Sequence, residues 1–278
     1  MRTVFVAIVD PDDPRVADYR QLNDGPFRRG LEAPKPFSPG IFVAEGWLVL
    51  ERALAARCDL RSILVAEQRQ DRLDEMLATI RGVTPEVLVA SPETIEQIVG
   101  FDLHRGVVAI GQRGRALDLG TLARRAKRVL VVEGVSDTEN LGALFRNAAA
   151  FGANAVMVDS TSADPWSRRV IRTSVGHSLS VPWCRGSISA IVRALEGHRL
   201  VALTPQGELD LGKVEHIEGV AVGIVVGAEG PGLTSDTLDA CAARVRIEMS
   251  PGVDSLNVAA AAAIAMWQLF DRPPHSTR

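Results

Sequence analysis

Two uninterrupted apolar segments limit the folds open to this chain. Residues 129–132 are four consecutive apolar residues, and the segment 220–226 reads Val-Ala-Val-Gly-Ile-Val-Val. A strand that is apolar on both faces must be covered on both faces, which is typical of a parallel sheet flanked by helices. Shorter apolar strands alternate with helical patterns along the rest of the chain. The sequence therefore predicts an α/β fold with a parallel sheet in its C-terminal part.

The predicted elements fall into two blocks, separated by a segment rich in glycine and charge. We expect an irregular N-terminal extension over residues 1–40, a small α/β domain over 41–111, a linker over 112–127 and a larger α/β domain over 128–272. The extension is expected to hold a strand at 4–9 and a short helix near 16–22. The small domain should contain strands 41–44, 62–65, 86–89 and 107–110 and helices 47–57, 73–80 and 93–99. The large domain should contain strands 128–133, 155–158, 200–204, 220–226 and 245–249 and helices 137–151, 166–175, 188–197 and 258–270.

Charge and composition exclude some classes of partner. The 278 residues include 31 basic and 34 acidic side chains, giving a net charge of -3. This balance argues against a strongly basic protein that coats nucleic acid. The arginines are clustered, however, and such clusters either contact phosphates or form solvated helix faces. The clusters contain Arg28, Arg29, Arg113, Arg115, Arg124, Arg125, Arg128, Arg168, Arg169 and Arg172.

Cysteine usage and hydropathy indicate a soluble, cytoplasmic protein without a structural metal. Cys58, Cys184 and Cys241 lie far apart and form no C-x-x-C pair, so neither a disulfide framework nor a zinc site is expected. The apolar start of the chain is short and runs into Asp10, unlike a signal peptide. No apolar run reaches the roughly 20 residues that a membrane span needs.

The expected helix 137–151 carries two polar residues away from its apolar stripe. Leu141, Leu144 and Phe145 follow the spacing of a buried helix face. Asn140 and Arg146 lie off that face, with Asn140 in the first turn. A helix amino end with an amide is a ready anion site, and Arg146 is available to a phosphate or a carboxylate. The alternative is a surface arginine paired with a neighbouring acid.

A glycine-rich turn follows the second apolar run. It reads Gly227-Ala-Glu-Gly-Pro-Gly, and Glu229 is its one charged side chain. Glycines allow the backbone to approach a ligand closely, although a plain strand-to-helix turn would also use them. The turn matches neither G-x-G-x-x-G, nor the P-loop, nor G-x-S-x-G, so nucleotide hydrolysis and serine esterase chemistry are poorly supported.

The third informative stretch is Ser255-Leu-Asn257, which precedes an alanine-rich helix. Ser255 is a natural cap for that helix. A helix rich in alanine can pack very closely against another backbone, and if exposed in a monomer it would be a hydrophobic liability. We expect it to be buried and partly at an interface between subunits.

Together these stretches resemble a known family. The segments Asn140-x-Gly-x-x-x-Arg146, Gly227-x-Glu-Gly-x-Gly-Leu233 and Ile247-x-Met-x6-Leu-Asn-Val258 are similar, in order and spacing, to the three motifs of the SpoU (TrmH) RNA ribose methyltransferases of the SPOUT superfamily. The similarity covers roughly residues 128–270. Residues 41–111 resemble, more weakly, the accessory α/β/α RNA-binding domain of that family. Glu248 departs from the family pattern, which usually has proline there.

The resemblance implies a fold, a cofactor and an assembly. The C-terminal segment would be threaded into a trefoil knot that binds S-adenosyl-L-methionine, and two chains would form a homodimer through the final helix and the Asn140 helix. No metal is implied. By motif position the cofactor residues would be Thr204, Gly227, Ile247, Met249 and Leu256.

The implied reaction is methylation of a ribose 2′-OH in structured RNA, ribosomal or transfer RNA. Because a guanidinium is a poor proton acceptor, we expect Arg146 to grip a phosphate and favour the developing alkoxide rather than act as a simple base. Asn140 and Glu229 would orient Arg146 and the loop, and Ser255 and Asn257 would shape the ribose pocket. The residues expected to contact RNA phosphates are Arg113, Arg115, Arg168 and Arg172.

Two other functions compete with this one. A non-catalytic RNA-binding or ribosome-associated protein could keep the fold without binding the cofactor. A dinucleotide-dependent oxidoreductase would need a glycine fingerprint after the first strand of a βαβ unit, which Gly134-Val-Ser-Asp137 does not supply.

Overall fold

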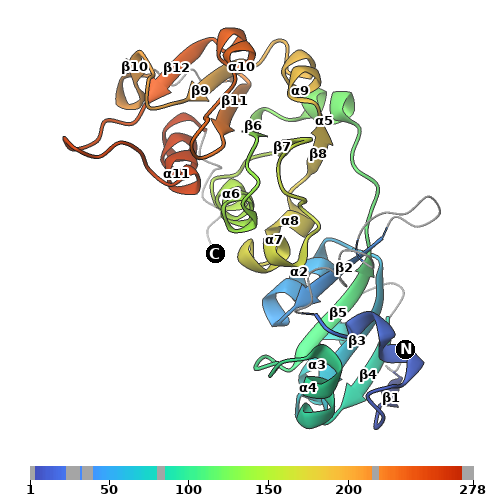
Figure 1. The fold of residues 1–278 in the computed structure, drawn as a ribbon. Helices are drawn as coiled ribbons and strands as arrows, with labels where there is room; N and C mark the ends of the chain where they lie inside the picture. Colours follow the sequence, from blue (N-terminus) through green and yellow to red (C-terminus); the bar gives the residue numbers. More distant parts are fainter. Residues whose placement is uncertain (1–3, 23–31, 33–39, 80–84, 215–218, 271–278) are drawn as a thin grey trace. The chain divides into compact units, whose positions relative to one another are not determined.

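A computed structural model describes residues 4–22, 32, 40–79, 85–214 and 219–270. The chain divides into two compact units, which are treated separately below (Figure 1). The first unit comprises Met1–Arg115 and Trp166–Ser180, and the second comprises Ala116–Pro165 and Val181–Arg278. The expected helix end at Ile80, the expected domain end at residue 272 and the basic pair Arg28 and Arg29 lie outside the described residues.

The first unit is built on a five-stranded mixed sheet with the order β1-β4-β3-β5-β2. β1, β4 and β3 run parallel, whereas β5 pairs antiparallel with both β3 and β2. Apolar side chains form a core cluster on each face of the sheet. The strands are β1 (Phe5–Ala7), β2 (Ile41–Glu45), β3 (Leu60–Ala66), β4 (Glu86–Ala90) and β5 (Val107–Gln112), and the helices are η1 (Pro14–Tyr19), α2 (Trp47–Ala55), η2 (Glu67–Arg69), α3 (Gln70–Ala78), α4 (Pro92–Val99), α7 (Arg168–Thr173) and α8 (His177–Ser180).

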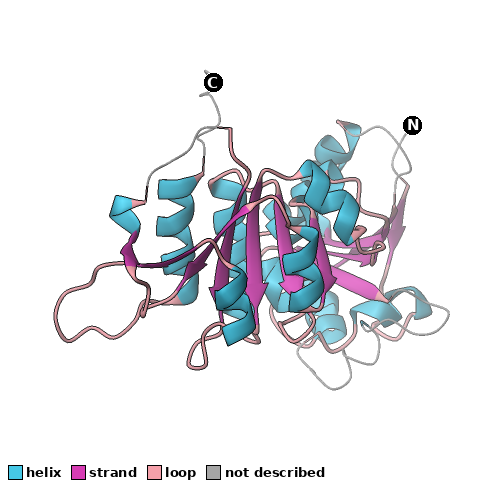
Figure 2. Cartoon of the chain, turned by 90° about the horizontal axis from the view of Figure 1, so that it is seen from above, coloured by secondary structure: helices cyan, strands magenta, loops and turns pink. Residues whose placement is uncertain are grey.

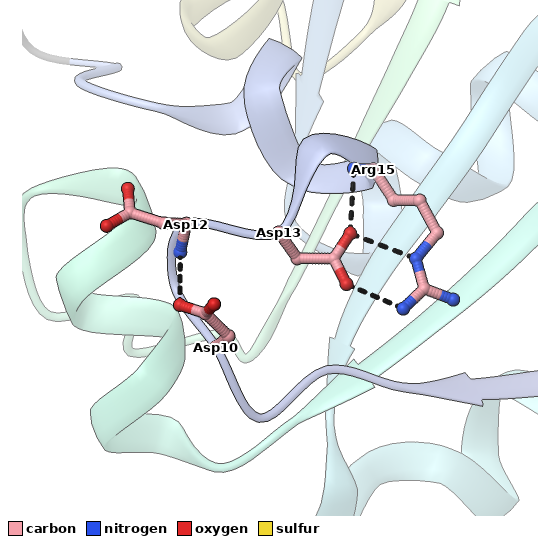
Figure 3. A network of polar contacts seen from close by, with 4 residues as sticks. All are labelled: Asp10, Asp12, Asp13 and Arg15. Atoms are coloured by element: carbon pink, nitrogen blue, oxygen red, sulfur yellow. Dashed lines mark hydrogen bonds and ion pairs between the residues drawn. The ribbon is translucent and has the colours of Figure 1, made fainter.

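Residues 4–22, the described stretch of the expected extension, are part of this unit. β1 adds to the sheet edge by pairing with β4, and Val16 and Tyr19 of η1 are fully buried in the same core. Figure 3 shows how the turn before η1 is fixed: the Asp13 carboxylate accepts hydrogen bonds from the backbone and guanidinium of Arg15. These bonds from Arg15 lower the pKa of Asp13 to about 2.

Helix α7 also belongs to the first unit, although the sequence placed its residues within the C-terminal domain. The guanidinium of Arg168 forms an ion pair of 2.6 Å with Glu45 of β2 and donates a hydrogen bond to the Leu22 carbonyl. The Trp166 ring packs on Phe42 with 5.2 Å between centroids. These long-range contacts leave no signature in the local sequence pattern.

The second unit is built on a seven-stranded sheet with the order β10-β12-β9-β11-β6-β7-β8. All of its strand pairs are parallel, which confirms the predicted parallel sheet. Its centre is formed by β6 and β11, the two apolar runs with which the sequence analysis began. The strands are β6 (Arg128–Glu133), β7 (Ala155–Asp159), β8 (Trp183–Gly186), β9 (Arg199–Leu203), β10 (Leu209–Asp210), β11 (Val222–Gly227) and β12 (Ala243–Arg246).

Helices pack against this sheet (Figure 2) and bring two motif-bearing elements together. The helices are α5 (Leu119–Arg125), α6 (Thr138–Ala150), α9 (Ile188–Ala194), η3 (Leu211–Lys213), α10 (Ser235–Ala240) and α11 (Val258–Leu269). The alanine-rich α11 packs against α6 and β11. Within the part of the chain that the structure describes, no helix is long and apolar enough to span a membrane.

Some predicted boundaries were wrong. The expected linker contains helix α5, whose first turn is capped by the Asp118 carboxylate. The expected strand 245–249 begins and ends earlier, as β12, so that Ile247 to Met249 form a loop. The edge strand β8 was missed because its Trp-Cys-Arg-Gly sequence has neither an apolar run nor alternation.

The buried pair Tyr19–Ser62 tests whether the N-terminal segment stabilises the first unit. Their hydroxyl oxygens lie 2.7 Å apart, and burial raises the pKa of Tyr19 above its ordinary value. We expect Tyr19→Phe to lower the free energy of unfolding by about 1–3 kcal/mol, because Ser62 is left without this partner. Urea denaturation measures the change. Adding Ser62→Ala should recover most of the loss, and a double variant as unstable as the sum of the two would contradict this account.

Candidate functional site

A cavity of the second unit lies at the carboxyl ends of β9, β11 and β12. It has a volume of about 680 Å³ and opens between three loops that follow these strands. In an open parallel sheet this edge is where ligands bind. All five residues expected to hold a cofactor line this cavity, together with three of the expected catalytic residues. They are Thr204, Gly227, Ile247, Met249 and Leu256, with Glu229, Ser255 and Asn257.

The glycine loop 227–233 folds back tightly on itself. The Gly232 amide donates a hydrogen bond of 3.0 Å to the Ala228 carbonyl, and Gly230 and Gly232 have φ values of 96° and 71°. A Cβ atom on Gly227 would lie 2.5 Å from the carbonyl carbon and oxygen of Gly232. Glycine is therefore required at Gly227 by close backbone approach and at the other two positions by a left-handed conformation.

Three polar side chains from the three motif regions form one hydrogen-bonded network. The Asn257 amide donates to Asn140 Oδ1 at 2.7 Å and to Glu229 Oε1 at 3.3 Å. The Asn140 amide also donates to Glu229 Oε1, at 3.1 Å. The network thus joins the start of α6, the glycine loop and the start of α11. It fixes the wall of the cavity on the side of Glu229.

Helix α11 is capped by Asn257, not by Ser255 as the sequence analysis expected. The Asn257 side-chain oxygen accepts hydrogen bonds from the amides of Ala259 and Ala260, at 3.0 and 3.2 Å. Because the oxygen caps the helix, the side-chain nitrogen is left to donate to the network. Ser255 is exposed and lies two residues earlier on the cavity wall. A further hydrogen bond joins α6 to α11, because the Asn147 side chain donates to the Ala259 carbonyl at 2.7 Å.

The start of α6 is held by two further carboxylates. The Asp137 carboxylate caps the helix by accepting a hydrogen bond of 2.7 Å from the backbone amide of Asn140. Asp159, at the end of β7, is buried and accepts hydrogen bonds from the Gly134 amide and from the amides and hydroxyls of Thr161 and Ser162. Burial alone would raise the pKa of Asp159, but the hydrogen bonds outweigh it and hold this pKa below its ordinary value.

Arg146 lies outside the cavity. It is exposed on α6, is not among the residues that line the cavity, and makes no hydrogen bond or ion pair with the described residues. The helix periodicity correctly placed Arg146 off the buried stripe, but the structure of a single chain does not bring it to Asn140 and Glu229. Its guanidinium is open to a ligand from solvent or from another chain.

The four arginines expected to bind RNA divide into two pairs, all within the first unit. Arg113 is buried and donates a hydrogen bond of 3.0 Å to the Ile41 carbonyl, and Arg168 forms the ion pair with Glu45. Both guanidiniums make contacts that hold this unit together, so we do not propose them as RNA contacts. Arg115 and Arg172 are exposed.

Glu248, the departure from the family pattern, points away from the cavity. Its neighbours Ile247 and Met249 line the cavity, whereas Glu248 lines a smaller pocket with Asp210 and Trp267. The hydrogen bond from the Gly212 amide holds the pKa of Asp210 below its ordinary value.

Sequence reasoning missed several residues of the cavity wall. Pro205, Gln206, Leu238 and Asp254 also line it. The signal for the first two was the Thr-Pro-Gln-Gly turn that directly follows strand β9. Among the described residues, no group of three His, Cys, Asp or Glu side chains is placed to hold a metal ion.

Comparison with known proteins identifies the family. The model of the SpoU rRNA Methylase family matches residues 127–267, about half of the chain. The chain belongs to the SpoU rRNA methylase family. This confirms the resemblance drawn from the three motifs.

Relatives of the family align along most of the chain. An uncharacterized tRNA/rRNA methyltransferase of Mycobacterium tuberculosis (strain ATCC 25618 / H37Rv) is 40% identical over 94% of this chain and 90% of its own length. The 23S rRNA (guanosine-2'-O-)-methyltransferase RlmB of Ralstonia nicotianae is 30% identical over 76% of this chain and 89% of its own length. A crystal structure of an AdoMet-bound rRNA methyltransferase from Sinorhizobium meliloti has the same fold, with a TM-score of 0.78 at 23% identity over 95% of this chain and 97% of that one.

The close approach at Gly227 gives a test of the loop geometry. We expect Gly227→Ala to destabilise the second unit by about 1–3 kcal/mol, because the new methyl group would meet the Gly232 backbone. Differential scanning calorimetry measures the loss. Gly186→Ala is the matched control, since a Cβ there has its nearest neighbours at 3.7 and 3.9 Å. Equal melting temperatures for Gly227→Ala and the control would rule out the tight loop.

Proposed function

We propose that this chain transfers a methyl group from S-adenosyl-L-methionine to a ribose 2′-OH in structured RNA. The observation that carries the proposal is the single cavity whose wall contains residues of the second and third family motifs, tied by hydrogen bonds to Asn140 of the first. The names of the relatives agree with it: one is a 23S rRNA (guanosine-2'-O-)-methyltransferase and another a tRNA/rRNA methyltransferase.

The residues of the cavity suit S-adenosyl-L-methionine. About 680 Å³ lies within the range of pockets that hold small molecules. Apolar side chains, including Ile247, Met249 and Leu256, provide a surface for an adenine ring, and glycine backbone provides hydrogen-bonding groups at close range. Glu229 and Asp254 place negative charge in the wall, which favours a cationic ligand. The cofactor, when bound, supplies an activated methyl group with a neutral leaving group.

The chain itself must align the ribose hydroxyl and help it to lose its proton. Arg146 would grip the neighbouring phosphate and stabilise negative charge on the hydroxyl oxygen, since it is exposed and without an internal partner among the described residues. Asn140 and Glu229 would hold the glycine loop, as their hydrogen bond indicates. Ser255 and Asn257 would shape the ribose pocket.

We propose in addition that the C-terminal segment forms the trefoil knot of the family. The support is local: the loops after β9 and after β12 line the same cavity as the glycine loop, and α11 returns to pack against β11. Such threading is an exception to the rule that chains are unknotted.

We also propose a homodimer that packs α6 and α11 across its two-fold axis. Ile264 and Trp267 of α11 are 43% and 54% exposed, and Leu256 and Val253 of the preceding loop are exposed as well. Large apolar side chains that gather on one exposed element mark an interface. A second chain packed on α6 would also contact the exposed Arg146.

The RNA would be held by the first unit as well as by the cavity. We assign residues 41–111 the role of accessory RNA-binding domain, with Arg115 and Arg172 as phosphate contacts because both are exposed. A cytoplasmic location follows from a ribosomal or transfer RNA substrate. The competing function, an RNA-binding protein without catalysis, would not need the cavity or its network.

Arg146→Ala separates catalysis from cofactor binding. We expect methyl transfer to fall by at least about a hundredfold, because electrostatic stabilisation is lost, while the dissociation constant for S-adenosyl-L-methionine stays unchanged. Transfer of a tritiated methyl group to total RNA and calorimetric titration measure the two quantities. Arg193→Ala, a change on another helix of the same unit, is the control. Lost cofactor affinity with intact turnover would refute this division of roles.

Trp267→Glu tests the homodimer. A charge at this exposed apolar position should convert the dimer to monomers, because it would be buried at the interface without a partner. Sedimentation velocity gives the oligomeric state. Leu48→Glu, at a 52% exposed position of the first unit, should leave the dimer intact. A monomeric wild-type chain would exclude the proposed assembly.

A further inference from the structure

Strand β6 ends in a buried glutamate, Glu133, that has no role in the proposed methyl transfer. Glu133 is 5% exposed, and its Oε1 accepts a hydrogen bond of 2.8 Å from the Thr234 hydroxyl. Its Oε2 is buried and has no hydrogen-bond partner among the described residues. Since burying a carboxylate oxygen without a partner destabilises a fold, stability alone does not account for a glutamate here.

Glu133 is a neighbour of both ends of the glycine loop. In the parallel pair of β11 and β6, Glu133 is the register partner of Gly227, where the loop begins. Its side chain is bonded to Thr234, directly after the loop ends at Leu233. One residue thus holds the point where the chain leaves β11 and the point where it enters α10.

Thr234 passes this restraint on to the helix. Its hydroxyl oxygen accepts from the Thr237 amide at 3.4 Å as the cap of α10, and it lies 3.0 Å from the Thr237 hydroxyl. A hydroxyl has one proton to donate. When that proton is given to Glu133, the lone pairs of Thr234 face Thr237 and complete the cap. The carboxylate therefore selects the hydroxyl orientation that both closes the loop and starts the helix.

The loop between these two points has few contacts of its own: the Gly232 amide donates to the Ala228 carbonyl, and Asn140 and Asn257 donate to Glu229. Gly230 and Gly232 carry no side chains and adopt positive φ values, and in both places an added Cβ would meet nothing within 4 Å. Glycine backbone is free to take many conformations, so the restraint at the two ends adds to these contacts in setting the loop conformation. Glu229, in the middle of the loop, is held in the cavity wall by Asn140 and Asn257, and the restraint at the loop ends supports the same position.

We propose that Glu133 is a positioning residue that acts through Thr234 to hold the loop 227–233, with Glu229, in the conformation that binds the cofactor. Glu133 does not itself line the cavity. This inference rests on the proposed function, because it takes the loop to be part of the binding site for S-adenosyl-L-methionine.

The test compares the affinity of variants for S-adenosyl-L-methionine with their stability. Glu133→Leu removes the acceptor and the unpaired oxygen together. We expect its dissociation constant and its KM for the cofactor to rise about tenfold with kcat nearly unchanged, while its melting temperature stays equal or increases. Glu133→Gln keeps an oxygen for Thr234 and should bind like the wild type. Calorimetric titration, methyl-transfer kinetics and scanning calorimetry provide these values.

Changes at Thr234 test the other side of the same bond. Thr234→Val should weaken cofactor binding about as much as Glu133→Leu, and Thr234→Ser should restore it, since serine keeps the hydroxyl. Ser187→Ala is the matched control: Ser187 is the hydroxyl cap of α9, a short helix of the same unit. It should lose a cap without losing affinity.

The outcomes separate this inference from the proposed function. A wild-type chain that does not bind S-adenosyl-L-methionine would overturn the proposed function. A wild-type chain that binds it, with Glu133→Leu and Thr234→Val binding equally well, would overturn the role of Glu133 alone. Should Glu133→Leu fail to fold, Thr234→Val decides: affinity like that of Ser187→Ala overturns the inference, and a loss rescued by serine supports it.

Discussion

The hydrogen-bonded network of Asn140, Glu229 and Asn257 is the interaction on which the rest of the site depends. Its members are 117 residues apart at their greatest separation along the chain, yet the two asparagine side chains lie 2.7 Å apart. Each asparagine side chain is fully used: Asn257 caps α11 with its oxygen and donates with its nitrogen, and Asn140 accepts with its oxygen and donates with its nitrogen. Neither could be replaced by aspartate or leucine without losing one of these roles.

The glycine loop that carries Glu229 of this network favours a particular shape over stability. Glycines 227, 230 and 232 sacrifice side-chain contacts so that the loop can turn back on itself. Buried carboxylates then hold the strand ends: Asp159 is fully surrounded by donors, whereas Glu133 keeps one oxygen unpaired. Sites that depart from the usual rules of folding are often ligand-binding sites. This edge of the sheet departs from two of them, because its loop gives up side-chain contacts at three glycines and Glu133 keeps a buried oxygen without a partner among the described residues.

The sequence predicted those features that arise from local pattern. The continuous apolar runs at β6 and β11 identified the centre of the sheet, because only strands covered on both faces read in this way. Gly227, Met249 and Asn257, which the motifs assigned to one site, line one cavity, because strand ends of a parallel sheet share an edge.

What escaped prediction depends on contacts between distant residues. Nothing around Arg168 or Arg113 distinguishes a guanidinium that holds a fold together from one that faces solvent, and the ion pair with Glu45 appears only in three dimensions. The same holds for the pairing of β1 with β4: a strand was expected at 4–9, but its place in the sheet was not. Ser255 was the expected cap of α11, and Asn257 takes this role because its amide can cap the helix and donate at once.

The most direct test of the central claim is whether S-adenosyl-L-methionine binds in the cavity between the glycine loop and α11. The chain has five methionines, of which Met249 lines this cavity while Met76 lies on α3 of the first unit. Methyl NMR of labelled methionine, recorded during titration with the cofactor, reports on both at once. The account predicts a saturable shift of the Met249 signal with Met76 unmoved. A Met249 signal that does not respond at saturating cofactor would contradict it.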